Sequence, residues 1–382
     1  MHPLLAQRLQ SLCDAGLHRS LKRCVFREGR ALEVDGRRLI DFASNDYLGL
    51  AGDPRMIAAA REALSQYGTG GRGSRLICGN HPLCDGLETA TAGFKGTEAA
   101  LAFSSGFVLN ATVLPALLGE GDAILADRLN HASLIDGAKL SGARLFTYAH
   151  NDPDALEKAL KRTRDYALRM VVTDTVFSMD GDIAPLREIH GLARAHDALL
   201  LVDEAHATGV LGPGGRGAVE AAGLSGKIDF VMGTYSKALG SLGAFVACGK
   251  SERDYLVNTA RGLIFTTALP PAVLAASRKG VELALEAEKE RQRLNALAGR
   301  VRRECAALGF LTGGSETQII PLILGQSEKA LAASNRLAEK GCLVPAVRFP
   351  AVKRNEARLR LSLSSAHTDG DIGLLLDALK GL

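Results

Sequence analysis

The chain has 382 residues, of which 47% are hydrophobic and 23% charged, and its formal net charge is +4. This length predicts two or three domains, and the balance of residue types is that of a globular protein. The mild positive charge argues against a nucleic-acid-binding surface, and no stretch reaches the roughly 18 apolar residues of a membrane span.

The first residues and the cysteines indicate where the protein works. The N-terminus lacks the apolar centre and the small-residue cleavage site of a signal peptide. Its Leu5, Leu9 and Leu12 predict one face of a short amphipathic helix. The seven cysteines include no Cys-x-x-Cys pair, which predicts free thiols in a reducing compartment. We therefore expect a cytoplasmic protein.

Three segments are expected along the chain, at residues 1–45, 46–280 and 281–382. The first would hold the N-terminal helix and a hairpin around Asp35-Gly36. In the second, short apolar runs alternate with helical patterns, which predicts a largely parallel sheet with helices on both sides. The runs lie at 99–103, 122–126, 144–148, 170–174, 198–202, 229–233 and 243–248.

The C-terminal part has a different pattern. Residues 272–308 have the spacing of one long helix, and strands are expected near 318–323 and 358–363. The third segment is therefore expected to be a smaller α+β domain.

Two polar residues stand at the ends of buried strands. Asp203 closes an apolar run at 199–203, and Lys237 follows the run at 229–233. Ligands of such sheets bind beyond the carboxyl ends of the strands, where we expect both side chains. A pyridoxal phosphate enzyme needs this pair of residues. The lysine amine forms a Schiff base with the cofactor, and the carboxylate keeps the pyridine nitrogen protonated.

Further polar residues follow neighbouring strands. Residues 104–110 turn from a strand into a helix, where free backbone amides favour a phosphate. Thr234 and Ser236 would add hydroxyls to the same phosphate. His131 would stack on a flat ring, and Ser178 would reach a ring substituent. Each of these patterns also fits an ordinary turn or a structural side chain.

The sequence Asp203-Glu204-Ala205-His206 admits two other interpretations. Its letters match a helicase motif in which acids hold Mg²⁺, and its aspartate and histidine, with His131, would suit a metal ion. The helicase interpretation needs a Walker A loop. The nearest match, Gly249-Lys250-Ser251, lacks the earlier glycine and comes after the acidic motif. The metal interpretation assigns no role to Lys237.

Arginines near both ends of the chain are typical of solvated surfaces. Arg358 and Arg360 differ because they alternate within an expected strand and so point to one side. One of them would bind a carboxylate through two parallel hydrogen bonds.

Seven motifs together resemble the α-oxoamine synthases, which are fold type I pyridoxal phosphate enzymes. They lie at residues 44–50, 68–75, 105–107, 131–133, 177–182, 203–206 and 236–238. They occur in the right order and cover nearly the whole chain. The resemblance implies an α/β fold with a mostly parallel central sheet and a smaller C-terminal α+β domain. It also implies pyridoxal 5'-phosphate as the cofactor and a homodimer as the working form.

The resemblance assigns a role to each matching residue around the cofactor ring. Lys237 would hold the cofactor and later move the α-proton of the amino-acid substrate. Asp203 would protonate the ring nitrogen, and His131 would stack on the ring. His206 and Ser178 would form hydrogen bonds with the phenolic oxygen.

The phosphate and the substrates would be bound by residues from other segments. The resemblance implies that the amides of Gly106 and Phe107, with Thr234, bind the phosphate, helped by Thr266 from the second subunit. The amino-acid carboxylate would meet Asn45 and Arg360, which come from opposite ends of the chain.

The resemblance places Arg19 and the segment around Ala351 near the acyl substrate. Relatives often carry a hydroxyl residue where this chain has Ala351, so only a backbone contact is expected there. Arg72 replaces a residue that is commonly small and would favour an anionic carrier.

Within the family, the sequences at 210–217 and 357–368 most resemble the biotin-pathway branch. This implies a condensation of L-alanine with a pimeloyl thioester carried by acyl carrier protein or coenzyme A. Glycine C-acetyltransferase and 5-aminolevulinate synthase share the cofactor motifs and stay as alternatives. Neither nucleic acid nor a membrane is expected as a partner.

Overall fold

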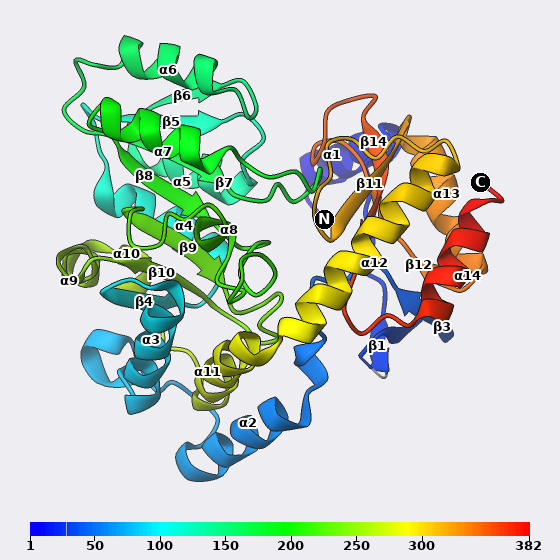
Figure 1. The fold of residues 1–382 in the computed structure, drawn as a ribbon, viewed down its shortest axis with the longest axis horizontal. Coiled ribbons are helices and arrows are strands. Elements are labelled where there is room, and N and C mark those ends of the chain that lie inside the picture. Colours follow the sequence, from blue (N-terminus) through cyan, green and yellow to red (C-terminus); the bar gives the residue numbers. More distant parts are fainter. Residues whose placement is uncertain (28) are drawn as a thin grey trace.

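A seven-stranded sheet forms the centre of the larger part of the molecule (Figure 1). The structure is a computed structural model and describes residues 1–27 and 29–382. The strands are β4 (Ala99–Phe103), β5 (Ala123–Asp127), β6 (Arg144–Tyr148), β7 (Arg169–Asp174), β8 (Leu199–Asp203), β9 (Phe230–Thr234) and β10 (Ala244–Cys248). Their order is β4-β10-β9-β8-β7-β5-β6. Only β10 runs antiparallel to its neighbours, so the expected mostly parallel sheet is confirmed.

Both faces of this sheet are buried, as the continuous apolar runs predicted. Alternate residues of one strand enter different cores: Leu201 faces one core, while Leu200 and Val202 face the other. Helices cover each face, because parallel strands need a crossover connection between them. The helices of this part are α2 (Pro54–Tyr67), α3 (Pro82–Lys95), α4 (Gly106–Leu117), α5 (Ala132–Ser141), α6 (Pro153–Arg162), α7 (Leu186–Ala195), α8 (Ala218–Ala221), α9 (Lys250–Thr259), α10 (Arg261–Ile264) and α11 (Pro271–Glu286).

The smaller domain contains two further sheets and lies to the right of the larger part in Figure 1. One sheet has the order β11-β14-β13 and is antiparallel. The elements of this domain are α12 (Glu288–Ala307), β11 (Ile319–Gly325), α13 (Ser327–Glu339), β12 (Cys342–Leu343), β13 (Ala346–Val347), β14 (Ala357–Ser362) and α14 (Asp369–Leu379).

The second small sheet joins the two ends of the chain. Its order is β1-β2-β3-β12, formed by β1 (Cys24–Arg27), β2 (Ala31–Val34), β3 (Arg37–Asp41) and β12. The expected hairpin turns at Asp35 and Gly36, whose φ angles of 49° and 82° suit a two-residue turn between antiparallel strands. Strand β3 then pairs in parallel with β12. The expected domain boundaries at residues 45 and 280 stay predictions.

The single long helix expected at 272–308 is wrong. The structure has two helices, α11 and α12, separated at Ala287, where ψ is 38°. Arg291 explains why the break is tolerated, because its guanidinium Nη1 donates to the carbonyl of Ala284 at the end of α11. A side-chain donor thus replaces the backbone donor that a continuous helix would have supplied.

The N-terminal helix α1 (Pro3–Asp14) forms where the leucine spacing predicted it. None of its residues is buried, and Leu5, Leu9 and Leu12 are 54%, 41% and 46% exposed. Among residues 1–27 and 29–382, no helix combines the length and apolar character needed to cross a bilayer.

Candidate active site

The carboxyl ends of several strands open into one cavity of about 180 Å³. Seven of the residues expected around the cofactor line it: Gly106, Phe107, His131, Asp203, His206, Thr234 and Lys237. They come from β8 and β9, from the segments that follow these strands, and from the first turns of α4 and α5. The parallel sheet therefore brings together residues that are far apart in sequence.

Lys237 and His206 lie side by side in the cavity. Lys237 Nζ lies 2.8 Å from His206 Nε2. Burial lowers the pKa of Lys237 to about 8, although Asp203 and Asp174 attract the ammonium. Burial also lowers the pKa of His206 well below its usual value, with Lys237, Arg360 and His131 acting in the same direction. His206 is therefore neutral near pH 7, and the amine of Lys237 is partly unprotonated there.

Asp203 is a buried carboxylate held in a fixed orientation. Its Oδ1 accepts from the amide of Ala205 at 2.9 Å, and its Oδ2 accepts from Asn110 Nδ2 at 3.0 Å. Each carboxylate oxygen can accept a second hydrogen bond. Asp203 can thus meet a protonated ring nitrogen without losing its protein partners.

Asn110 is a site residue that the sequence analysis missed. It is the amide residue of the mainly apolar helix α4, and it is fully buried. A buried amide needs hydrogen-bond partners, and the position one turn after Gly106 was the signal that could have found it. Its Nδ2 also contacts Ser133 Oγ at 3.0 Å, which ties α4 to α5.

His131 forms one wall of the cavity. Its ring Nδ1 lies 2.8 Å from Ser133 Oγ, and its backbone amide donates to Asp174 Oδ2 at 2.6 Å. The side chain remains exposed toward the open cavity, so a flat ring can stack on it.

Asp174 is a second missed residue, although it closes β7 as Asp203 closes β8. The two aspartates are paired in the sheet register, and Asp174 also lines the cavity. Burial raises the pKa of Asp174 well above its usual value, and the nearby charge of Asp203 adds to this effect.

The N-terminus of α4 forms the end of the cavity suited to a phosphate. Ser105 caps the helix by accepting from the amide of Val108, while Gly106 and Phe107, at the first two helical positions, have no intrahelical acceptor. A Cβ on Gly106 would lie 2.9 Å from Met232 Cε. The absence of a side chain at this position therefore lets the cavity floor approach the helix end closely.

Thr234 lies beside this helix end, but its hydroxyl already has protein partners. Thr234 Oγ1 donates to the carbonyl of Gly243 at 2.7 Å and is 2.7 Å from Ser236 Oγ. A hydroxyl has one proton to donate. Ser236, which also lines the cavity, is therefore the donor in the contact with Thr234 Oγ1, and its hydroxyl would have to leave this bond to donate to a phosphate.

Asn45 and Arg360 meet at the other end of the site, as the sequence predicted. Arg360 Nη2 lies 3.4 Å from Asn45 Oδ1, and Arg360 Nε donates to the carbonyl of Ser178. Tyr47, which the sequence analysis did not single out, connects this pair to His206. Its Oη lies 3.0 Å from Asn45 Oδ1 and 2.7 Å from His206 Nδ1.

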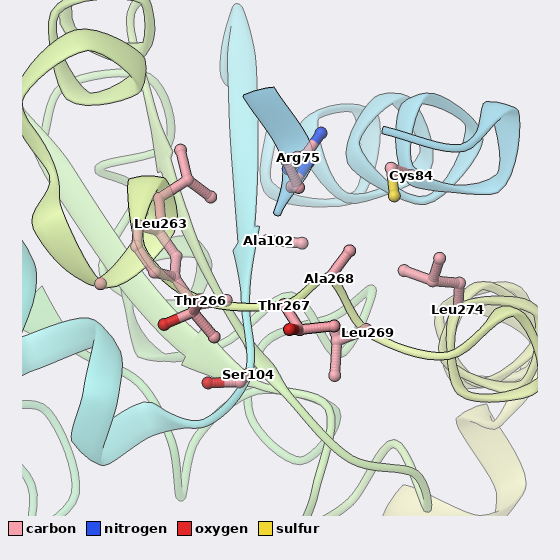
Figure 2. Close-up of a pocket in the computed structure, with 12 residues that line it drawn as sticks. Arg75, Cys84, Ala102, Ser104, Leu263, Thr266, Thr267, Ala268, Leu269 and Leu274 are labelled. Carbon is pink, nitrogen blue, oxygen red and sulfur yellow. The ribbon is translucent and has the colours of Figure 1, made fainter. Parts of the chain in front are cut away.

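Besides Asn45 and Arg360, four more expected site residues are not among those that line the cavity. Ser178 contributes its backbone carbonyl to Arg360 and is not among the lining residues, so the expected bond from its hydroxyl stays a prediction. Thr266 lines a separate cavity of about 30 Å³, together with Ser104 and Leu263 (Figure 2). This position fits its expected role toward a second subunit but does not test it.

Arg19 and Ala351 are both exposed and belong to loops of the smaller domain. Arg348 connects these two regions, because its guanidinium donates to the carbonyls of Gly16 and His18. Neither residue lines the cavity, so the expected contacts with an acyl substrate stay predictions.

The groups around the cavity match those of pyridoxal phosphate. The cofactor carries a ring nitrogen, a phenolic oxygen, an aldehyde and a phosphate. Asp203 offers a carboxylate to the nitrogen, and the neutral His206 offers a ring nitrogen to the phenolic oxygen. Lys237 offers an amine to the aldehyde, and the first turn of α4 offers free amides to the phosphate. The donor set therefore fits the cofactor.

Comparison with known proteins gives the same result over nearly the full length. Residues 37–379 match the family Aminotransferase class I and II. The chain is 48% identical to an 8-amino-7-oxononanoate synthase of Trichlorobacter lovleyi over 371 residues, which covers 97% of this chain and 95% of the relative.

Two solved structures have a similar fold. A serine palmitoyltransferase from S. paucimobilis, solved with a bound PLP–myriocin aldimine, has a TM-score of 0.94 and 33% identity, with 99% of this chain and 96% of that chain covered. An 8-amino-7-oxononanoate synthase from Francisella tularensis has a TM-score of 0.77 and 30% identity, with 90% of this chain and 97% of that chain covered.

These similarities argue against the helicase and metal interpretations of residues 203–206. They agree with pyridoxal phosphate as the cofactor of the cavity. The chain belongs to the 8-amino-7-oxononanoate synthase family, within the pyridoxal phosphate-dependent enzymes of fold type I.

Proposed function

We propose that the protein condenses L-alanine with a pimeloyl thioester and releases CO₂ and a thiol to form 8-amino-7-oxononanoate. The observation that carries the proposal is the position of the Asn45–Arg360 pair. Three hydrogen bonds connect Asn45 to Lys237, through Tyr47 and His206, and Arg360 lies beside Asn45. An amino acid whose carboxylate binds at this pair would have its α-carbon near the lysine amine.

The residues of the chain would orient the reactants and move one proton. Pyridoxal phosphate, when bound, draws electrons away from the α-carbon of an attached amino acid. Asp203 would hold a proton on the ring nitrogen. The negative charge of Asp203 acts strongly there because the carboxylate is buried. His131 would cover one face of the ring and leave the other face to Lys237.

Lys237 would serve first as the attachment point of the cofactor and then as the base. Its pKa of about 8 makes a proton acceptor available near neutral pH. Neutral His206 would hold the phenolic oxygen without adding a second positive charge beside Lys237. Arg360 would meet the carboxylate through its guanidinium fork, and Asn45 through its amide.

The acyl substrate would enter past the loops that carry Arg19 and Ala351. Arg19 is exposed and suits an anionic carrier, either acyl carrier protein or coenzyme A. Ala351 has no hydrogen-bonding side chain, so any polar contact there would use its backbone. Arg72, in the glycine-rich loop, would add a further positive charge.

We also propose that the protein is a homodimer that works in the cytoplasm. Ile77, Phe107 and Phe265 are 83%, 51% and 70% exposed, and a second subunit that covers them would remove this apolar surface from water. Thr266 adjoins Phe265, which supports a contribution of Thr266 to the neighbouring subunit. All seven cysteines are free thiols, which supports a reducing compartment.

The test is a substrate panel with thiol release as the readout. Purified enzyme is supplied with alanine, glycine or serine and with pimeloyl-, acetyl- or succinyl-coenzyme A, and pimeloyl acyl carrier protein is tested in parallel. We expect turnover only with alanine and a pimeloyl thioester. Turnover confined to glycine with acetyl- or succinyl-coenzyme A would overturn the proposal, and serine is included because of the similarity to serine palmitoyltransferase.

A pair of lysine variants separates the chemistry from general damage. Lys237→Ala should lose both the near-visible absorption of the bound cofactor and the thiol release. Lys289→Ala, at an exposed position on α12, should retain both. A colourless Lys237→Ala variant with full activity would contradict the assigned role of this lysine.

A further inference from the structure

Tyr47 occupies a position between the carboxylate-binding pair and the reactive lysine. It is fully buried, and burial raises the pKa of its phenol, so the hydroxyl keeps its proton. A phenol has one proton to donate and can also accept. Two acceptor atoms lie within reach of that proton: His206 Nδ1 at 2.7 Å and Asn45 Oδ1 at 3.0 Å.

The proton of His206 likewise has two possible positions, one on each ring nitrogen. A neutral imidazole carries one proton, either on Nδ1 or on Nε2. Nε2 faces Lys237 and Nδ1 faces Tyr47, each within hydrogen-bonding distance. The positive charges near the ring come from Lys237 and Arg360, and both oppose a second ring proton. With Lys237 as an ammonium, or with an acceptor facing Nε2 in its place, the two residues have one arrangement each in which these atoms all have a partner.

In the first arrangement Lys237 is an ammonium and donates to Nε2. The ring proton is then on Nδ1 and is donated to Tyr47 Oη, while the phenol donates to Asn45 Oδ1. In the second arrangement the ring proton is on Nε2 and is donated to an acceptor in the cavity. Nδ1 then accepts the proton of Tyr47, and Asn45 Oδ1 retains Arg360 at 3.4 Å. His206 and Tyr47 hold the same number of protons in both arrangements.

We propose that Tyr47 is a positioning residue that lets neutral His206 change its tautomer, from an acceptor facing the Lys237 ammonium to a donor facing the bound cofactor. Lys237 as a free ammonium requires the first arrangement. A cofactor attached to Lys237 presents a phenolic oxygen, which is an acceptor and requires the second. Tyr47 satisfies Nδ1 in both cases by reversing the direction of one hydrogen bond.

The first test follows the ring of His206 in the wild-type chain. The protein is labelled with ¹⁵N-histidine, and the His206 signals are identified by their loss in His206→Asn. Below pH 8 without cofactor we expect the proton on Nδ1, and after loading we expect it on Nε2. The same tautomer in both forms would overturn the proposal. Visible absorption reports cofactor loading separately, so a failure to bind cofactor is not mistaken for a failure to switch.

The second test removes the phenol oxygen with Tyr47→Phe. With Phe at this position the ammonium form of Lys237 leaves a buried N–H on Nδ1 without an acceptor. The amine form leaves only a bare nitrogen, which is less costly. The midpoint pH at which Lys237 takes up pyridoxal phosphate should therefore fall by roughly one unit.

Tyr148→Phe is the matched control, because Tyr148 is also buried but ends β6 outside the cavity. Its midpoint should equal that of the wild type. An unchanged or higher midpoint in Tyr47→Phe would overturn the proposal, and the wild-type measurement decides the question if this variant does not fold. The inference depends on Lys237 carrying the cofactor and is independent of which acyl group is transferred.

Discussion

Lys95 and Glu204 form a buried ion pair behind the active site, and its removal should destabilise the protein strongly. Lys95 Nζ lies 2.6 Å from Glu204 Oε2 and 2.8 Å from Thr208 Oγ1, and it also donates to the carbonyl of Arg216. The other oxygen of Glu204 accepts from the amide of Val219 at 2.7 Å. Lys95 is 5% exposed and Glu204 is 0% exposed.

The variant Lys95→Met keeps most of the side-chain volume, so the expected loss is electrostatic rather than a cavity effect. It leaves the Glu204 carboxylate buried without its counter-charge, and breaking such a pair costs about 3–5 kcal/mol. Glu204 follows Asp203 directly in the chain. A disturbance at this pair should therefore also weaken cofactor binding.

The measurement is urea unfolding of the wild type, Lys95→Met, Glu204→Gln and the double variant. The double variant should recover much of the loss, because no buried charge remains unpaired. The midpoint of Lys95→Met should fall without a change in the slope of the transition. A loss below about 1 kcal/mol, typical of an exposed pair, would refute the reasoning, as would a double variant that is no more stable than Lys95→Met.

Two further predictions concern side chains that hold the loop after β7. His150 lies between two aspartates, one of them Asp182 at 2.7 Å, and although burial lowers its pKa, these carboxylates raise it to about 9. A raised pKa gives stability that is complete below the unfolded value near 6.5 and is lost as the pH rises toward 9. Unfolding midpoints of wild type and His150→Gln should therefore differ most at pH 6 and converge near pH 10, and a constant difference would contradict the assignment. Arg360→Lys should raise KM for alanine by about 10- to 100-fold with a smaller change in kcat, because a bidentate contact is lost. Arg358→Lys is its control: Arg358 binds Asp180, so thermal stability should fall while KM stays within about twofold, and equal KM effects would refute the distinction.

The central sheet could be predicted closely because its strands are continuous apolar runs with polar residues at their ends. Asp203 and Lys237 were found for this reason. Tyr47 and Asn110 were not, because their partners His206 and Asp203 lie 159 and 93 residues away in sequence. No local pattern reports such a contact.

The helix boundary at Ala287 could not be predicted for a related physical reason. Alanine favours a helix and the apolar spacing continues across it, so the local signal is helical. The break depends on the Arg291 side chain, which reaches back to the carbonyl of Ala284. Local propensity does not contain this tertiary contact.

The pairing of β3 with β12 has a consequence for the order of events during synthesis. The N-terminal hairpin leaves the ribosome first, but its parallel partner Leu343 is made near the end, as is Asp371, which binds Arg30 at 2.6 Å. All strands of the large sheet are available once Cys248 has emerged. The large sheet of a nascent chain can therefore form while the edge of β3 is still unpaired, and the smaller domain can close only after β12 and Asp371 have been made.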